Sequence, residues 1–384
     1  MVNHVDLDEP FVRDLTLADF PFLASLAASE SAHDRRIWLR VAIDHFVAVE
    51  PKDPDAQERF SDVVALQLDS AGAATRLEIA RRLAPCARTP ARLLKKFESA
   101  DSEAGDYMLE RAVAYTDHDL EQAVARGGRH AVAVAKRKNV SPQIVCALAA
   151  RDEVDVLVAL ASNGSARLEG GMLVDLLLRA RTLAEQAGDR RLADSLLQRR
   201  PLAPEGAALF LCAKPGQRVD ILLAAQRLQL GRPRAFAPPI QQEWLDELEL
   251  AAVARKPERF VAILAEALDC DPELARRIVD DASGEPLAVA LAALGASNEV
   301  LVRVLISNDL SAGASYQRIR ALARLNNALN RNAAIAVMAA LRGETAALRR
   351  SQSLVDTTAP AQPRAAKARM ATKPFEPPQR KAVS

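Results

Sequence analysis

The sequence predicts an all-α protein, and composition, periodicity and helix-start signals support that prediction. Hydrophobic residues make up 49% of the 384 residues while aromatic residues make up only 4%, and much of the apolar content is Ala and Leu. Those two residues favour helices, whereas strands prefer β-branched and aromatic residues. Apolar residues also recur at helical spacing, as in Val154, Leu157, Val158 and Ala161. No segment of comparable length alternates with the period of a strand.

Proline marks the starts of four predicted helices. A side chain able to cap a helix directly precedes proline at Asp53-Pro54, Thr89-Pro90, Ser141-Pro142 and Asp271-Pro272. The cap oxygen accepts a backbone N–H that has no partner inside the helix, and proline at the first helical position has no N–H to leave unpaired. The helices bounded in this way are short, and short helices bury an apolar face only by stacking on their neighbours.

Internal similarity indicates that the stacked helices form an array. Ala80-Arg81-Arg82-Leu83 runs through a turn into Thr89-Pro90, and Ala135-Lys136-Arg137-Lys138 runs through a turn into Ser141-Pro142. A second similarity joins Leu160–Asn163 with Leu305–Asn308, where Asn is expected to end a helix in the left-handed conformation. The sequence therefore predicts a HEAT-like α-solenoid of antiparallel helix pairs in two stacked arrays, with a disordered C-terminal tail.

The phrases ARRL…TPARLL, VAKRKNVSPQIV and VLVALASN, between Arg76 and Asn163, resemble an uncharacterised alphaproteobacterial domain-of-unknown-function family. That family is described as helical and related to HEAT and leucine-rich-variant repeats. The block from Ala275 to Leu341 is similar to its C-terminal portion, and together the two blocks indicate a resemblance over about residues 30 to 345. The resemblance implies a helical-repeat fold and assigns no activity, cofactor or catalytic residue.

Proline and glycine divide the chain into five predicted segments. Residues 1–30 are expected to be a leader, residues 31–200 a HEAT-like helical array, and residues 201–239 a Pro-interrupted helical connector and linker. Residues 240–345 are expected to form a second helical array. Residues 346–384 are basic and rich in Pro and Ala, with few core-forming residues, so disorder is expected there.

The charge is balanced overall but unevenly distributed. The net charge is +1, so no global field attracts nucleic acid or anionic lipid. Between Arg349 and Ser384, however, eight basic residues stand against two acidic ones, a net charge of +6 that leaves −5 for the rest. The sequence therefore predicts an acidic body followed by a basic tail.

The same sequence predicts a cytoplasmic protein. The first residues lack the basic flank and apolar run of a signal peptide. The most apolar stretches are far shorter than the roughly 20 residues that span a bilayer, so no transmembrane segment is expected. Cys86, Cys146, Cys212 and Cys270 lack paired spacing and stand in helical, apolar contexts, which favours buried free thiols in a reducing compartment.

No motif in the sequence indicates catalysis. The paired glycines Gly127-Gly128 and Gly170-Gly171 lack the context of a nucleotide-binding loop and are expected to be turns between helices. Asp117-His118-Asp119 is the only tight acid–histidine cluster, and it is expected to form the first turn of a helix beginning near Thr116. The sequence therefore predicts a non-enzymatic protein with no catalytic residues, cofactor or metal site.

Nucleic-acid binding is the main alternative. Residues Ala135 to Ala147 have the outline of a helix-turn-helix. The second of these helices, Ile144 to Ala150, is almost wholly apolar and has few groups to read base edges. The two Trp and three Tyr of the chain also offer little surface for stacking on single strands.

We therefore expect a protein-interaction scaffold or regulatory adaptor that uses its helical-repeat surfaces. The basic pairs Arg81-Arg82 and Lys136-Arg137 occupy equivalent places in the repeat and are candidates for binding an acidic segment of an unknown protein partner. The simpler explanation is that they satisfy helix C-termini. Phe375, which stands among prolines in the tail, is the candidate anchor of a linear motif.

Overall fold

The computed structural model describes residues 31–48, 54–99, 102–230, 238–307 and 316–343. Over these residues the predicted all-α class is confirmed, because they form helices, turns and irregular backbone and no strand. The predicted leader, residues 1–30, and the predicted tail, residues 346–384 with Phe375, lie outside the described residues. The boundaries of the five predicted segments stay predictions.

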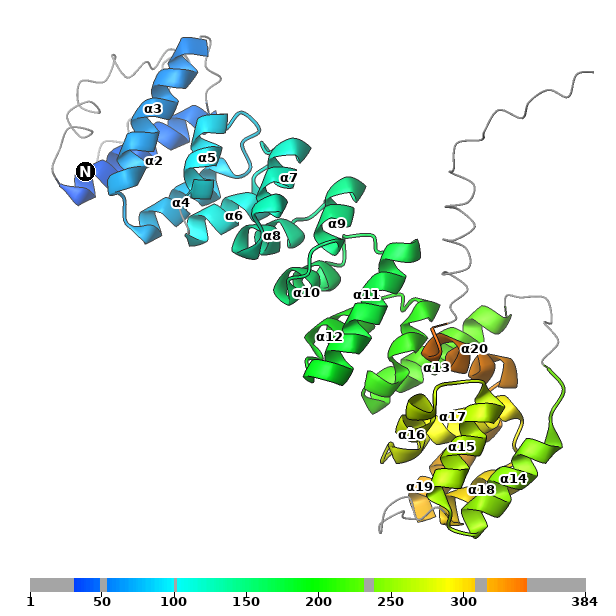
Figure 1. The fold of residues 1–384 in the computed structure, drawn as a ribbon. Helices are drawn as coiled ribbons and strands as arrows, with labels where there is room; N and C mark the ends of the chain where they lie inside the picture. The colour runs from blue at the N-terminus through cyan, green and yellow to red at the C-terminus, as the bar shows by residue number, and fades with distance from the viewer. Residues whose placement is uncertain (1–30, 49–53, 100–101, 231–237, 308–315, 344–384) are drawn as a thin grey trace, which may run out of the picture.

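The first part of the chain is a row of helices (Figure 1). Each helix packs against the next but one, so that α2, α4, α6, α8, α10 and α12 contact one another in turn, while α3–α5, α7–α9 and α9–α11 form a second layer. The bounds are α2 Ala32–Ala48, α3 Pro54–Ser70, α4 Ala73–Leu83, α5 Ala91–Ser99, α6 Glu103–Arg111, α7 Asp117–Arg126, α8 Gly128–Ala135, α9 Pro142–Ala149, α10 Val154–Ser162, α11 Gly170–Thr182 and α12 Arg191–Gln198.

The helices that follow pack into a cluster at the other end of the row (Figure 1). In it α20 packs against α17, α13 and η4, so the two described helices of the predicted connector, η4 and α13, are part of the packed structure. The bounds are η3 Leu183–Ala187, η4 Pro204–Cys212, α13 Pro215–Leu230, α14 Gln242–Val253, α15 Pro257–Leu268, α16 Pro272–Asp280, α17 Glu285–Leu294, α18 Asn298–Ser307, α19 Tyr316–Ala328 and α20 Arg331–Leu341.

The repeat step in the first part is short. Helices α5, α7 and α9 begin at residues 91, 117 and 142, a step of 26 and then 25 residues. HEAT and armadillo repeats take roughly 40–47 residues. The difference follows from the helices themselves, which are only 8 to 10 residues long in α5 to α10.

The proline signals located the helix starts to within one residue, but of the three expected caps that the structure describes, Thr89, Ser141 and Asp271, only Asp271 makes a capping hydrogen bond. Pro142 and Pro272 are the first residues of α9 and α16, and Asp271 accepts a hydrogen bond from the backbone N–H of Glu273 at 2.8 Å. Ser141, in contrast, makes no capping hydrogen bond. The Thr89 hydroxyl donates to the carbonyls of Leu83, at 3.0 Å, and Cys86. Thr89 is buried beside the end of α4, where it satisfies carbonyls of the preceding helix.

Side chains from one helix satisfy the C-terminal carbonyls of the previous helix in the same layer. Arg137 donates to the carbonyls of Leu109 and Ala112, at 2.8 and 2.9 Å, where α6 ends. Asn163 does not adopt the expected left-handed conformation, because its φ is −78°. Its amide instead donates to the carbonyls of Ala135 and Arg137, at 2.8 and 2.7 Å, where α8 ends. Arg199 then donates to the carbonyls of Ala161 and Asn163 beyond α10.

The second layer uses the same device. Arg179 donates to the carbonyls of Ala149 and Arg151, at 3.4 and 2.9 Å, where α9 ends. Arg88 and Arg151 donate in the same way to the carbonyls of Val47 near the end of α2 and Ala125 near the end of α7. Other arginines donate to C-terminal carbonyls of helices that are not the previous one in their layer: Arg76 to Leu68, Arg181 to Leu341, Arg331 to Ala293 and Arg342 to Leu268. A helix leaves its last four carbonyls without internal partners, so these contacts meet a need of every short helix in the row.

Gly127 shows how closely successive helix pairs approach. It joins α7 to α8 with a φ of 72°, a conformation that favours glycine. A Cβ atom at this position would lie 2.5 Å from Nη2 of Arg151 and 2.6 Å from Oε1 of Glu153. The expected turn at Gly127-Gly128 is therefore confirmed, and the ion pair of the next helix pair fills the space beside it.

The structure makes different predictions for the two neighbours Arg137 and Lys136. Replacing Arg137 by Met should lower the free energy of unfolding by about 2 kcal/mol, because the carbonyls of Leu109 and Ala112 lose a charged donor. Replacing the exposed Lys136 by Met should change it by less than about 0.5 kcal/mol. Urea denaturation followed by circular dichroism measures both, and equal effects would contradict the capping role.

The exposure of the four cysteine thiols gives a test of how the helices pack. Cys86 and Cys212 are buried and Cys270 is partly buried, as expected, but Cys146 is exposed. The expectation was wrong for Cys146 because α9 buries the face that carries Ile144, Val145 and Leu148. Brief treatment of the folded protein with iodoacetamide should label Cys146 first and Cys86 and Cys212 only after denaturation. Mass spectrometry of the labelled peptides checks the order, and early labelling of Cys86 would refute this packing.

Candidate functional site

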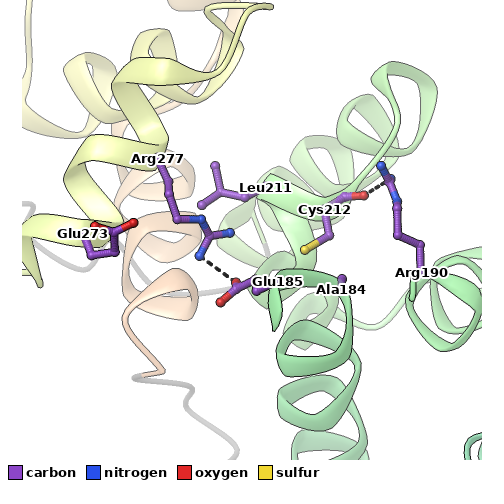
Figure 2. Close-up of a pocket in the computed structure, with 7 residues that line it drawn as sticks. All are labelled: Ala184, Glu185, Arg190, Leu211, Cys212, Glu273 and Arg277. Atoms are coloured by element: carbon purple, nitrogen blue, oxygen red, sulfur yellow. Dashed lines mark hydrogen bonds and ion pairs between the residues drawn. The ribbon is translucent and has the colours of Figure 1, made fainter. Parts of the chain in front are cut away.

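A pocket of about 400 Å³ lies where the row of helices meets the cluster that follows it. The lining side chains come from η3, from the residue before α12, from the end of η4, and from α16 (Figure 2). The lining residues are Ala184, Glu185, Arg190, Leu211, Cys212, Glu273 and Arg277. Four of these carry charges, so the pocket is predominantly polar.

The backbone that carries Glu185 is itself unusual. The α-helix α11 widens into a five-residue π-helical turn, Leu183–Ala187, which ends at Gly188 with a φ of 68°. Such turns are rare and occur frequently at functional sites, because the extra residue changes the direction of the side chains. Here the π-helical turn directs Glu185 toward Arg277 on α16 (Figure 2).

Glu185 connects three parts of the chain. Its carboxylate pairs with Arg181 at 2.6 Å and with Arg277 at 2.7 Å. Arg181 also donates to the carbonyl of Leu341, the last residue of α20. One carboxylate, 26% exposed, thus holds α11, α16 and the end of α20 together through two arginines.

The one thiol of the pocket is a weak nucleophile. Burial raises the pKa of the Cys212 thiol, and the negative charge of Glu185 raises it further, outweighing three nearby arginines. A thiol that stays protonated at neutral pH is a poor nucleophile. Within the described residues, no group of three or more His, Cys, Asp or Glu side chains is placed to hold a metal ion. The pocket instead presents carboxylates and guanidiniums to a polar ligand or segment.

A second ionic cluster ties α13 to the loop between α16 and α17. Arg218 on α13 is only 7% exposed and pairs with Asp281 at 2.6 Å and Glu285 at 3.1 Å. It also donates to the Ser283 hydroxyl at 2.6 Å and to the Phe210 carbonyl at 3.2 Å. A guanidinium with five donors suits such a set of acceptors, so the cluster fixes the packing of the predicted connector.

The predicted partner-binding residues separate into two kinds. Arg82 pairs with Asp44 and Glu78, and Arg137 caps α6, so both serve contacts within the chain. Lys136 is exposed at the end of α8. Arg81 is exposed on α4, and its guanidinium lies 5.9 Å from the ring centroid of Tyr107. The basic pairs Arg81-Arg82 and Lys136-Arg137 were predicted to occupy equivalent places in the repeat. In both pairs the first residue, Arg81 or Lys136, is exposed and the second is partly buried.

Tyr107 and Arg111 were not among the predicted site residues. The guanidinium of Arg111 lies 5.3 Å from the Tyr107 ring centroid, so two guanidiniums lie close to the same ring. Residues 81, 111 and 136 lie at the ends of α4, α6 and α8, which pack side by side. We call Arg81, Tyr107, Arg111 and Lys136 the basic ridge. The sequence held one signal for it, because Tyr107 follows Arg81 by 26 residues, the length of a repeat step.

The acid–histidine cluster has the structural role expected for it. Asp117, His118 and Asp119 form the first turn of α7, where Thr116 and Asp119 make a reciprocal capping box. The His118 ring contacts Gln122 Nε2 at 2.9 Å on the exposed face of the same helix. The cluster is distant in sequence from the pocket and contributes no residue to its lining.

Comparison with known proteins shows that the middle of the chain is similar to a protein family. Residues 106–233 match the model of a family described as an uncharacterised protein conserved in bacteria (DUF2336). No curated protein and no solved structure matches the chain. The matched range runs from within α6 to just beyond α13. It includes Glu185 and Cys212 of the pocket and Tyr107 and Arg111 of the basic ridge. Among the described helices, none is long and apolar enough to cross a membrane.

The Arg218 cluster gives a stability prediction that depends on pH. Burial acts to raise the pKa of Asp281, but hydrogen bonds from Arg218 and Ser283 and the charge of Arg218 outweigh it and hold the pKa below its usual 3.8. This contribution to stability is present above that value and is lost as the pH falls through the lowered pKa. Replacing Arg218 by Met should therefore cost about 3 kcal/mol at pH 7, and the loss should shrink below about pH 4.

Lys214 provides the control for this variant. It precedes α13 and forms a more exposed ion pair with Asp194 at 3.0 Å. Replacing Lys214 by Met should cost less than about 1 kcal/mol at any pH. Urea denaturation at pH 7, 5 and 3.5 measures both variants, and a loss at Arg218 that is independent of pH would rule out the pairing with Asp281.

Proposed function

We propose that the protein is a non-enzymatic, cytoplasmic scaffold or regulatory adaptor that binds a protein partner through its helical-repeat surface. The architecture we propose is a HEAT-like α-solenoid of antiparallel helix pairs with a compact repeat. Two observations support it: the two layers of helices in contact along the row, and the side chains that join each helix to the one before it. Repeat arrays of this kind present extended surfaces to partners.

The basic ridge is the observation that carries the proposal. Its helices are held in register by contacts within the chain, so binding a partner costs little further ordering of the backbone. Tyrosine and arginine are also the residues that most often dominate binding energy at protein interfaces. The partly buried Tyr107 ring lies close to the guanidiniums of Arg81 and Arg111, and Lys136 extends the positive charge onto α8. This chemistry suits an acidic segment that carries an apolar side chain.

The charges of the ridge also favour a protein partner over nucleic acid. Arg82 and Arg137, which would add to a phosphate-binding surface, are engaged by Asp44 and by the end of α6. The helix that has the outline of a recognition helix, α9, packs Ile144, Val145 and Leu148 into the core. Strong nucleic-acid binding generally requires several free cations that contact phosphates.

The experiment compares partners recovered by the wild-type chain and by charge-reversal variants. Crosslinking in a bacterium that naturally produces the protein, followed by purification of the full chain, should recover a reproducible protein partner. Arg81→Glu combined with Arg111→Glu should reduce that recovery at least tenfold. Lys95→Glu combined with Lys256→Glu changes the net charge equally at exposed positions away from the ridge and should leave recovery unchanged.

Two results would contradict the proposal. Equal loss in both double variants would show that only overall charge matters. Recovery that depends on bound DNA or RNA, and disappears after nuclease treatment, would favour the nucleic-acid-binding alternative. Both pairs of substitutions lie at exposed positions, so we expect all variants to fold. Circular dichroism of the purified variants checks this.

A further inference from the structure

The outer face of α14 combines acidic and apolar side chains. Leu250 and Val253 are 62% and 59% exposed, although the rest of the described chain buries most residues of this type. Glu243, Asp246 and Glu247 share the same exposed side of the helix. The opposite side packs into the core through Leu245, Leu248, Ala251 and Ala252. Helical spacing therefore gathers three carboxylates and two exposed aliphatic side chains on one stripe.

Helix α18 packs against α14 and carries a further exposed aliphatic side chain, Ile306. The Ile240 side chain, just before α14, lies against Gly295, just before α18, and Glu249 pairs with Arg303 further along at 3.1 Å. The two helices therefore run in the same direction, which places Val253 and Ile306 at the same end. Ile306 is 62% exposed. We call Glu243, Asp246, Glu247, Leu250, Val253 and Ile306 the α14–α18 face; Figure 1 shows the two helices next to each other.

The charge on this face is largely uncompensated. Within the part of the chain that the structure describes, Glu243 and Glu247 have no hydrogen-bond or ion-pair partner, and Asp246 accepts a hydrogen bond only from the Gln242 amide at 2.9 Å. The nearest cation on α18, Arg303, is engaged by Glu249 and lies close to Glu299. An occupant of the face should therefore be basic and should carry apolar side chains for Leu250, Val253 and Ile306.

The chain contains a segment of that composition. Residues 364–381 carry six basic side chains and one acidic side chain, together with Met370 and Phe375. The basic residues are Arg364, Lys367, Arg369, Lys373, Arg380 and Lys381, and the acidic one is Glu376. The charge of this segment is opposite to that of the α14–α18 face, and its two large apolar residues can cover the exposed aliphatic side chains.

The chain also leaves α20 close to this face. Arg342 donates to the carbonyl of Leu268, the last residue of α15, at 2.6 Å. Helix α15 packs against α14, and the short turn between them makes them antiparallel, so the end of α15 lies near the beginning of α14 and Glu243. A chain spans at most about 3.3 Å per residue. Gly343 and Phe375 are 32 residues apart in the sequence, so Phe375 can reach any point of the face.

We propose that residues 364–381 bind the α14–α18 face of the same chain, with the carboxylates of α14 attracting the basic side chains and Met370 and Phe375 covering the aliphatic ones. Intramolecular attachment raises the effective concentration of the segment at the face, so modest contacts suffice. This inference is independent of the basic ridge, which lies on α4, α6 and α8.

Carbodiimide crosslinking of the full-length protein tests the contact directly, because it joins lysine amines to carboxylates that touch them. At low salt, Lys367, Lys373 and Lys381 should link to Glu243, Asp246 or Glu247 at least tenfold more often than to the exposed carboxylates Asp117 and Glu121 on α7. High salt should abolish the preference, since it screens charge attraction. Even linking across all these carboxylates would overturn the proposal.

A pair of variants separates the apolar contribution from that of charge. Leu250→Ser with Val253→Ser leaves every carboxylate in place and should reduce the α14 crosslinks at least threefold. Val219→Ser with Leu223→Ser removes another exposed aliphatic pair, on α13, and should leave the crosslinks unchanged. A mixture of nitrogen-15-labelled and unlabelled protein shows whether the links lie within one chain. Links mainly between labelled and unlabelled chains would overturn the intramolecular contact.

Discussion

The rest of the structure depends on how short helices satisfy their last backbone carbonyls. A helix leaves four C-terminal carbonyls without internal partners, which is half of the eight residues in α8 or α9. Packing in two layers buries many of these groups away from water, where an unpaired carbonyl is costly. The following helix supplies the donor, as Arg137 does for α6 and Asn163 for α8. The same contacts therefore complete the helices and fix their spacing.

The contact between the row of helices and the cluster that follows uses this device in a more elaborate form. Arg181 donates to the end of α20 and also pairs with Glu185, which in turn holds Arg277 on α16. Arg218 performs a similar task between α13 and the loop before α17. Arginine suits both positions because its planar guanidinium can bind a carbonyl and a carboxylate at once. The charged side chains that remain exposed are therefore candidates for binding. They form the basic ridge on α4, α6 and α8 and the acidic α14–α18 face.

Much of the fold was predictable from local rules, while the sites depended on contacts between distant residues. Composition, periodicity and the prolines that begin α9 and α16 predicted the helical class and several helix starts. The roles of Arg82 and Arg137 were not predictable, because Asp44 and Leu109 lie 38 and 28 residues away in the sequence. The pocket was missed because Glu185 and Arg277 come from remote segments. Tyr107 could have been predicted from the sequence as a site residue, because it follows Arg81 by one repeat step of 26 residues.

The forward placement of the capping donors gives the row of helices a direction. The donors at the ends of α6 and α8 come from the next helix pair, so the loss of that pair exposes carbonyls on its N-terminal neighbour and leaves the capping contacts of its C-terminal neighbour in place. Separation should therefore advance more easily from α12 toward α2 than in the opposite direction. The contacts of Arg181 and Arg218 lie at the end of the row where such separation would begin. The cluster of helices from α13 to α20 acts, in this sense, as the end cap of a directional stack.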